Sequence, residues 1–154
     1  MKRRGRAALL ASALLSLAAA DAAAQWVPTG ALAAIPVVRD CNETGGDVAV
    51  SRLDPPTIYV CERVVRLIRS KEPGVEHFYL VHEYGHVAQG TADEAAADCW
   101  AAKALAKAPN GRRYLAAAIA HFRRRPARDA SPIYGTPVER AERIGRCADE
   151  ADDP

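Results

Sequence analysis

The pattern of hydrophobic and polar positions changes character midway along the chain. In the first half, residues 47–53 (DVAVSRL) alternate between apolar and polar, and residues 57–62 (TIYVCE) are β-branched and aromatic. Both patterns predict short β-strands. A proline pair precedes the TIYVCE segment, and proline cannot donate to a strand ladder. We therefore expect TIYVCE to be an edge strand.

The second half of the chain has helical spacing of its apolar residues. In residues 75–89, one side of the predicted helix is apolar, and the opposite side carries His82 and His86. Gly90 ends this helix, and Thr91 is placed to cap the next one, which runs to about Ala108. Further helices are predicted over residues 64–70, 112–125 and 138–150. The irregular stretch 26–41 has no clear period.

The order of these elements indicates an α+β fold. We expect a small, mostly antiparallel sheet packed against the 75–89 helix and two to three further helices. A length of 154 residues suits one domain.

The first 24 residues read as a secretory signal peptide. A basic start is followed by an alanine-rich apolar run and small residues before Gln25. The run is too short and too rich in alanine to favour a membrane span. We therefore expect residues 25–154 to form the mature domain, exported to the periplasm or secreted, with no stable membrane insertion.

The charge of the chain changes when this segment is set aside. Four of the 21 basic residues and one of the 19 acidic residues lie within it. The mature domain therefore carries 17 basic and 18 acidic residues. A domain near neutrality lacks the basic surface of a nucleic-acid-binding protein. We expect no nucleic-acid partner.

All four cysteines lie in the mature domain, and their number is even. In a small exported domain this predicts two disulfides. Of the three possible pairings we favour Cys41–Cys61 and Cys99–Cys147, because each joins neighbouring predicted segments. Zinc ligation by cysteine is disfavoured, because the chain has no CxxC spacing.

The stretch HEYGHVAQGTADEAAAD, residues 82–98, carries the candidate chemistry. Its H-E-x-x-H pattern places His82 and His86 on one face of a helix, where both imidazoles can bind a single Zn²⁺. Glu83 points aside from that face, so it is placed to act on a zinc-bound water as general base.

Three acids downstream are candidates for the third zinc ligand. Glu94 and Asp98 are four residues apart on the next helix, so one can bind zinc while the other accepts the free N–H of a ligand histidine. Asp93 is the least favoured of the three candidates. Thr91 and Glu94 also fit a capping box, which explains Glu94 without a metal. Asp98 favours the metal interpretation, because a carboxylate among apolar turns needs a partner.

These residues resemble the gluzincin signature of zinc metallopeptidases, H-E-x-x-H followed by E-x-x-x-D. The stretch also resembles small exported metallopeptidase-like proteins, over roughly residues 56–106. The resemblance implies that His82, His86 and Glu94 bind zinc and that Asp98 orients a ligand histidine. It also implies that the TIYVC strand is the edge with which an extended peptide pairs. The link from His86 to Glu94 is much shorter than in thermolysin-like enzymes.

The expected function is zinc-dependent hydrolysis of a peptide or protein substrate, with Glu83 as the base. Tyr134 is the first candidate for the hydrogen-bond donor to the oxyanion, and His121 is the second. His121 is expected to lie on the solvated face of its helix. The alternative is a non-catalytic, disulfide-stapled binding module that keeps the zinc site, since about 130 residues leave little material for a deep cleft. Glu83 discriminates between the two, because a binding module needs no base.

Overall fold

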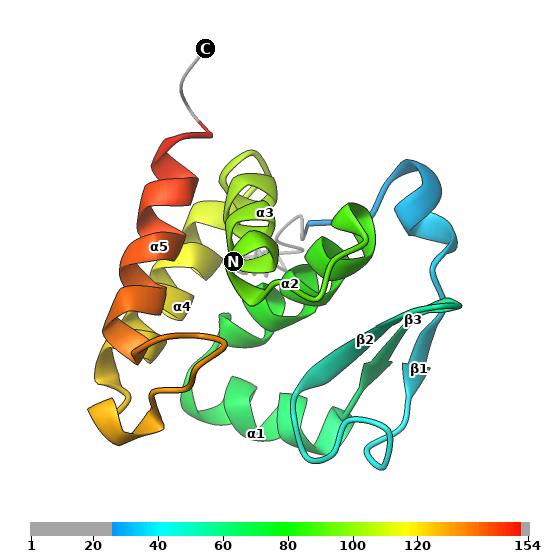
Figure 1. Cartoon of the computed structure of the whole chain (residues 1–154), viewed down its shortest axis with the longest axis horizontal. Helices are drawn as coiled ribbons and strands as arrows, with labels where there is room; N and C mark the ends of the chain where they lie inside the picture. Colours follow the sequence, from blue (N-terminus) through cyan, green and yellow to red (C-terminus); the bar gives the residue numbers. More distant parts are fainter. Residues whose placement is uncertain (1–25, 152–154) are drawn as a thin grey trace, which may run out of the picture.

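The computed structural model describes residues 26–151, which form a small sheet and five α-helices (Figure 1). The strands are β1 (Val37–Arg39), β2 (Ala49–Leu53) and β3 (Pro56–Val60). The helices are α1 (Glu62–Lys71), α2 (Val75–Gln89), α3 (Glu94–Ala106), α4 (Gly111–Arg124) and α5 (Pro137–Asp149). Two short 3₁₀ helices are η1 (Gly30–Ala34) and η2 (Ala127–Asp129). The α+β class expected from the sequence is confirmed.

The sheet is mixed, with strand order β1-β3-β2. β2 and β3 form an antiparallel hairpin, whereas β1 pairs parallel to β3. The expectation of a mostly antiparallel sheet is therefore wrong. The expectation that the TIYVCE segment lies at an edge is also wrong, because β3 is the central strand.

The position of the prolines explains why β3 can be central. Pro56 is the first residue of β3 and pairs only with Leu53, at the turn of the hairpin. β1 pairs with Ile58, Tyr59 and Val60, beyond the proline. The missing N–H of Pro56 therefore falls outside the β1 ladder, and the first position of a strand is one where proline is tolerated.

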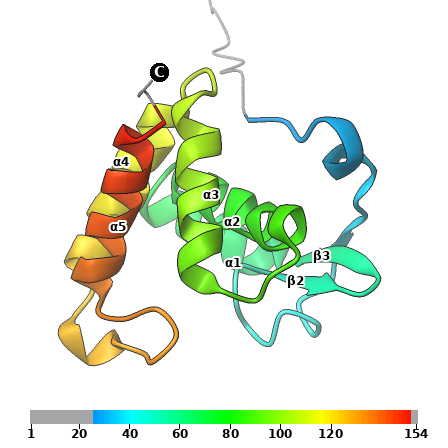
Figure 2. The ribbon, with the colours of Figure 1, turned by 45° about the horizontal axis from the view of Figure 1, so that its top comes forward.

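Helix α2 is the central element of the molecule. It lies between the sheet on one side and α3, α4 and α5 on the other (Figures 1 and 2). Its residues contribute to two hydrophobic clusters, Phe78 and Val81 to one among the helices and Tyr84 to one beneath the sheet. His82 and His86, on the other side of α2, are also buried. Four helices accompany α2 among the described residues, one more than the two to three expected.

Two disulfides tie the elements together, Cys41–Cys61 and Cys99–Cys147. They are the pairs favoured by the sequence. The first joins the segment after β1 to the start of α1, and the second joins α3 to α5. Such bridges indicate an oxidising environment. The expected signal peptide, 1–24, lies outside the described residues, and within 26–151 no helix is long and apolar enough to cross a membrane.

A glycine allows α2 and α3 to approach each other closely. A Cβ built on Gly85 would lie 2.9 Å from the carbonyl oxygen of Ala97 and 3.1 Å from its Cα. Both atoms are backbone, so they cannot move aside without moving α3. The close approach brings the first turn of α3 against the histidine face of α2.

We expect Gly85→Ala to lower the free energy of unfolding by about 1–3 kcal/mol, because the added methyl group overpacks this contact. Chemical denaturation measures the change. Gly145→Ala in α5 is the matched control, since its Cβ would meet only Ile119 Cδ1, at 3.9 Å. That helical substitution should be neutral or stabilising by up to about 1 kcal/mol. Equal effects at the two positions would contradict the role of Gly85.

Candidate metal centre

Two histidines of α2 bring their ring nitrogens together at the surface of α3. His82 and His86 are both buried, and their Nε2 atoms are 3.1 Å apart. The spacing of four residues places the two rings one turn apart on the same face of the helix. The structure therefore brings together the two histidines that the sequence predicted as a pair.

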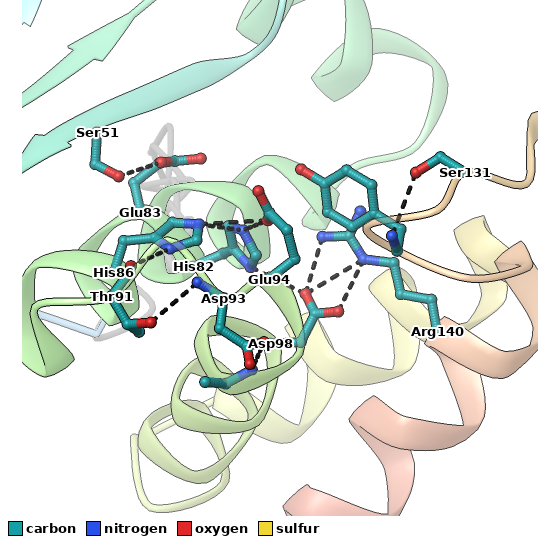
Figure 3. Close-up of polar contacts among 12 residues, drawn as sticks. Ser51, His82, Glu83, His86, Thr91, Asp93, Glu94, Asp98, Ser131 and Arg140 are labelled. Carbon is teal, nitrogen blue, oxygen red and sulfur yellow. Dashed lines mark hydrogen bonds and ion pairs between the residues drawn. The ribbon is translucent and has the colours of Figure 1, made fainter.

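The third member of the cluster is Glu94, the first residue of α3. Its Oε2 lies 2.9 Å from Nε2 of His82 and 3.3 Å from Nε2 of His86 (Figure 3). Gly90 closes α2 in a left-handed conformation, with φ of 59°. This turn lets the short link double back, so that α3 starts beside the histidines. The three side chains form a group that can hold a metal ion.

The cap of α3 is Asp93, and the predicted capping box between Thr91 and Glu94 does not form. Asp93 Oδ1 accepts the backbone N–H of Ala96 at 3.0 Å. Thr91 Oγ1 accepts the backbone N–H of Asp93 instead, at 3.1 Å. Glu94 is therefore the first residue after the N-cap, not the third as a capping box requires. Its carboxylate turns toward the histidines. The capping explanation of Glu94 is wrong for this reason.

The outer nitrogens of the two rings have partners that fix which nitrogen carries the proton. His86 Nδ1 donates to the carbonyl oxygen of Thr91 at 2.8 Å. His82 Nδ1 lies 2.9 Å from Asp98 Oδ1, in an off-axis approach that makes this an electrostatic contact more than a well-aligned hydrogen bond. When each ring is neutral with its proton on Nδ1, both Nε2 atoms present lone pairs that a cation can accept.

Two lone pairs and a carboxylate oxygen converging at about hydrogen-bond distance repel one another unless a positive charge lies among them. Tetrahedral zinc, with ligands at about 2.0–2.1 Å, separates its ligand atoms by about 3.3 Å. The observed separations are 2.9, 3.1 and 3.3 Å. Residues His82, His86 and Glu94 therefore fit a tetrahedral metal with a fourth position left over.

The ionisation of the cluster also reflects its attraction for positive charge. Burial alone lowers the pKa of His82, but its contacts with Asp98 and Glu94 raise that pKa to about 9. Burial raises the pKa of Glu94, but the two histidines hold it well below its usual range. In the metal-free protein a proton therefore occupies the place that a cation would take.

Glu83 lies beside the cluster without being part of it. Its side chain is buried and points toward β2, where Ser51 Oγ donates to its Oε2 at 2.8 Å (Figure 3). Ser51 pairs with Ile58 across the hairpin, so both side chains face α2. Burial raises the pKa of Glu83, whereas His82 and the Ser51 hydrogen bond lower it, and the net shift is upward. A carboxylate with a raised pKa is a suitable proton acceptor.

Asp98 is fully buried and is held by two arginines that the sequence analysis did not single out. Arg140 donates from Nη2 to Oδ1 at 2.9 Å and from Nε to Oδ2 at 3.0 Å. Arg143 Nη2 donates to Oδ2, also at 2.9 Å. In the sequence these arginines stand only as a pair three residues apart on an amphipathic helix. Nothing local indicates their partner, because Asp98 lies more than 40 residues away.

Tyr134 comes near the cluster from the segment between α4 and α5. Its side chain lies close enough to Glu94 for the two groups to shift each other's pKa. Burial and the negative charge of Glu94 raise the pKa of Tyr134 well above its usual range, so the phenol stays protonated. His121 is buried rather than solvated, contrary to expectation. Its Nδ1 lies 2.9 Å from Glu72 Oε2 and its Nε2 lies 3.1 Å from the hydroxyl of Tyr79.

The cluster opens into a cleft of about 550 Å³, a size that accommodates a ligand. Its walls come from β2, α1, α2, α3, α4, the Tyr134 segment and the first turn of α5. The described domain, although small, therefore has room for a ligand beside the histidines.

Comparisons with protein-family models, with curated protein sequences and with solved structures found no match to this chain. Its function must therefore be inferred from the side chains of this site.

Proposed function

We propose that the protein is an exported zinc-dependent peptidase. The observation that carries the proposal is the convergence of three acceptor atoms, from His82, His86 and Glu94, with the carboxylate of Glu83 beside them in an open cleft. Three protein ligands with a free fourth position are typical of a catalytic rather than a structural zinc site. The gluzincin-like spacing of these residues agrees with this proposal.

Zinc held by these three residues would supply an activated water and would polarise the peptide carbonyl. Glu83 would take the proton of the attacking water and return it to the leaving nitrogen. Burial raises the pKa of Glu83, which makes its carboxylate a better proton acceptor. Ser51 holds the carboxylate in place through its hydrogen bond.

Tyr134 is the proposed donor to the oxyanion that forms when the carbonyl is attacked. Its phenol remains protonated, because burial and the negative charge of Glu94 raise its pKa, so it keeps a proton to donate. A donor that is fixed before the reaction stabilises developing charge without reorganisation.

The edge strand β2 offers a place for an extended peptide. Residues 46–51 line the cleft, and β3 occupies only one side of β2. A peptide that pairs with the free edge would continue the sheet alongside Glu83. The sequence resemblance implied that the TIYVC strand pairs with the peptide. That strand is β3, which is central, so we propose the edge strand β2 instead.

The site of action that we propose is the periplasm or the extracellular space. Both disulfides support it, because such bridges persist in oxidising compartments.

Chelation tests the proposal directly. The protein comprising residues 25–154 should bind one Zn²⁺ and cleave members of a broad fluorogenic peptide library. Treatment with a chelator should abolish cleavage, and one equivalent of Zn²⁺ should restore it. Zinc binding measured by calorimetry without any cleavage would contradict the peptidase and favour a binding module. Failure to bind zinc would contradict both.

A further inference from the structure

The two arginines of α5 contact the site at two places. Both donate to the buried carboxylate of Asp98. Arg140 Nε and Nη2 together bind its two oxygens (Figure 3). The guanidinium of Arg140 also lies over the ring of Tyr134, at 4.2 Å, and over the ring of Phe122, at 4.3 Å. Arg143 Nη2 donates in addition to the backbone carbonyl of Tyr134, at 3.2 Å.

We propose that Arg140 and Arg143, named here the arginine clamp, are positioning residues of the site. The clamp fixes Asp98 beside a ligand histidine, and it fixes Tyr134 beside the ligand carboxylate. This inference deepens the proposed function and rests on it.

The first action of the clamp is on Asp98. A buried carboxylate that faced only His82 could rotate, and its charge would be poorly compensated. Arg140 supplies a planar fork that matches both oxygens and so sets the orientation of the carboxylate. One oxygen, Oδ1, then remains 2.9 Å from His82 Nδ1. Partners of this kind set the orientation of a ligand ring.

The second action is on Tyr134, which lies in an irregular segment. Apart from the clamp, the structure gives this residue a local hydrogen bond from its backbone N–H to Ser131 Oγ, at 3.2 Å. The buried guanidinium of Arg140 is sandwiched between two aromatic rings, an arrangement that fixes the plane of the tyrosine. The hydroxyl is thereby held on the side of Glu94.

A purely structural role would be to join α3 to α5. The disulfide between Cys99 and Cys147 already joins these helices, one residue after Asp98. The clamp is thus not needed simply to connect them. What it adds is the orientation of groups that face the metal ligands.

Two substitutions of Arg140 separate the actions of the clamp. Arg140→Met keeps the bulk but removes both the fork and the charge, so zinc affinity should fall about 10- to 100-fold. Arg140→Lys keeps a charge beside Asp98 but cannot lie flat between two rings. Its zinc affinity should stay within about threefold of wild type, while kcat falls about tenfold and KM is unchanged. Arg146→Gln, an exposed position on α5, is the control and should change neither quantity.

Zinc affinity is measured by competition with a chelating dye, and kcat and KM with a fluorogenic peptide, below the unfolding temperature of every variant. The Tyr134 arm also has a readout without metal. Chymotrypsin should cleave after Tyr134 about tenfold faster in metal-free Arg140→Met than in Arg146→Gln, because local opening becomes easier.

Wild-type zinc affinity and wild-type chymotrypsin cleavage in Arg140→Met would overturn the clamp. Parallel loss of zinc affinity and kcat in Arg140→Lys, with a lowered unfolding temperature, would also overturn it in favour of a structural role. A wild-type protein that fails to hydrolyse peptides contradicts the proposed function instead. In that case zinc affinity and chymotrypsin cleavage still test the clamp.

Discussion

Replacing Glu83 by glutamine is expected to lower kcat/KM for peptide hydrolysis by about 10²- to 10⁴-fold, because the amide cannot accept a proton from water. Zinc affinity should remain within a few-fold of wild type, since Glu83 is not among the three converging side chains. The glutamine can still accept the hydrogen bond from Ser51. The loss should therefore be chemical rather than structural.

Stability measurements separate this effect from damage to the fold. Burial raises the pKa of Glu83, which means that the folded protein disfavours the charged carboxylate. The neutral glutamine should leave the free energy of unfolding at pH 7 unchanged or slightly higher. Hydrolysis by Glu83→Gln at the wild-type rate would exclude Glu83 as the base.

Ser51→Ala is a matched control for the same carboxylate. It removes a hydrogen bond that favours the charged form, so the pKa of Glu83 should rise further. The base acts only when ionised, and so the acid limb of kcat/KM should move to higher pH. The plateau at high pH should change little, in contrast to the loss of about 10²- to 10⁴-fold expected for Glu83→Gln.

The features that could be predicted from the sequence are those set by local spacing. The helix over residues 75–89 has the bounds of α2 in the structure, because a glycine in the left-handed conformation follows it. His82 and His86 meet because residues four apart share a face of a helix. Glu94 reaches them because the link between the helices is short.

The arrangement of the strands could not be predicted in the same way. β1 comes from an irregular stretch with no alternation, and its three residues are all exposed. It pairs with β3 across an intervening hairpin, which makes β3 central. The proline rule was applied to the whole TIYVCE segment, whereas the residues that pair with β1 are Ile58, Tyr59 and Val60, which lie beyond the prolines.

The groups around His82, His86 and Glu94 depend on contacts between distant parts of the chain. Ser51 and Glu83 are 32 residues apart, and Arg140 and Asp98 are 42 apart. Sequence reasoning found that Asp98 needed a partner among apolar turns. A histidine of the preceding helix was the expected partner. The arginines of α5 could not be predicted, because the local pattern does not show that this helix packs against α3.

Replacing Glu94 by alanine is expected to weaken zinc binding by more than the 10- to 100-fold typical for an outer partner, because it removes one of three protein ligands. Alanine is well tolerated in a helix, so α3 should persist. Metal titration of the purified variant measures the loss, and circular dichroism checks the fold.

Two neighbouring acids provide the comparison that makes this prediction sharp. Asp93→Ala removes the cap of α3, which should cost about 1 kcal/mol of stability but leave zinc affinity near wild type. Asp98→Asn should weaken zinc binding by about 10- to 100-fold, since its carboxylate acts through His82. The expected order of loss in affinity is therefore Glu94, then Asp98, then Asp93. If Glu94→Ala held zinc as tightly as wild type, the third ligand would have to be another group, and the short link between α2 and α3 would lose its functional meaning.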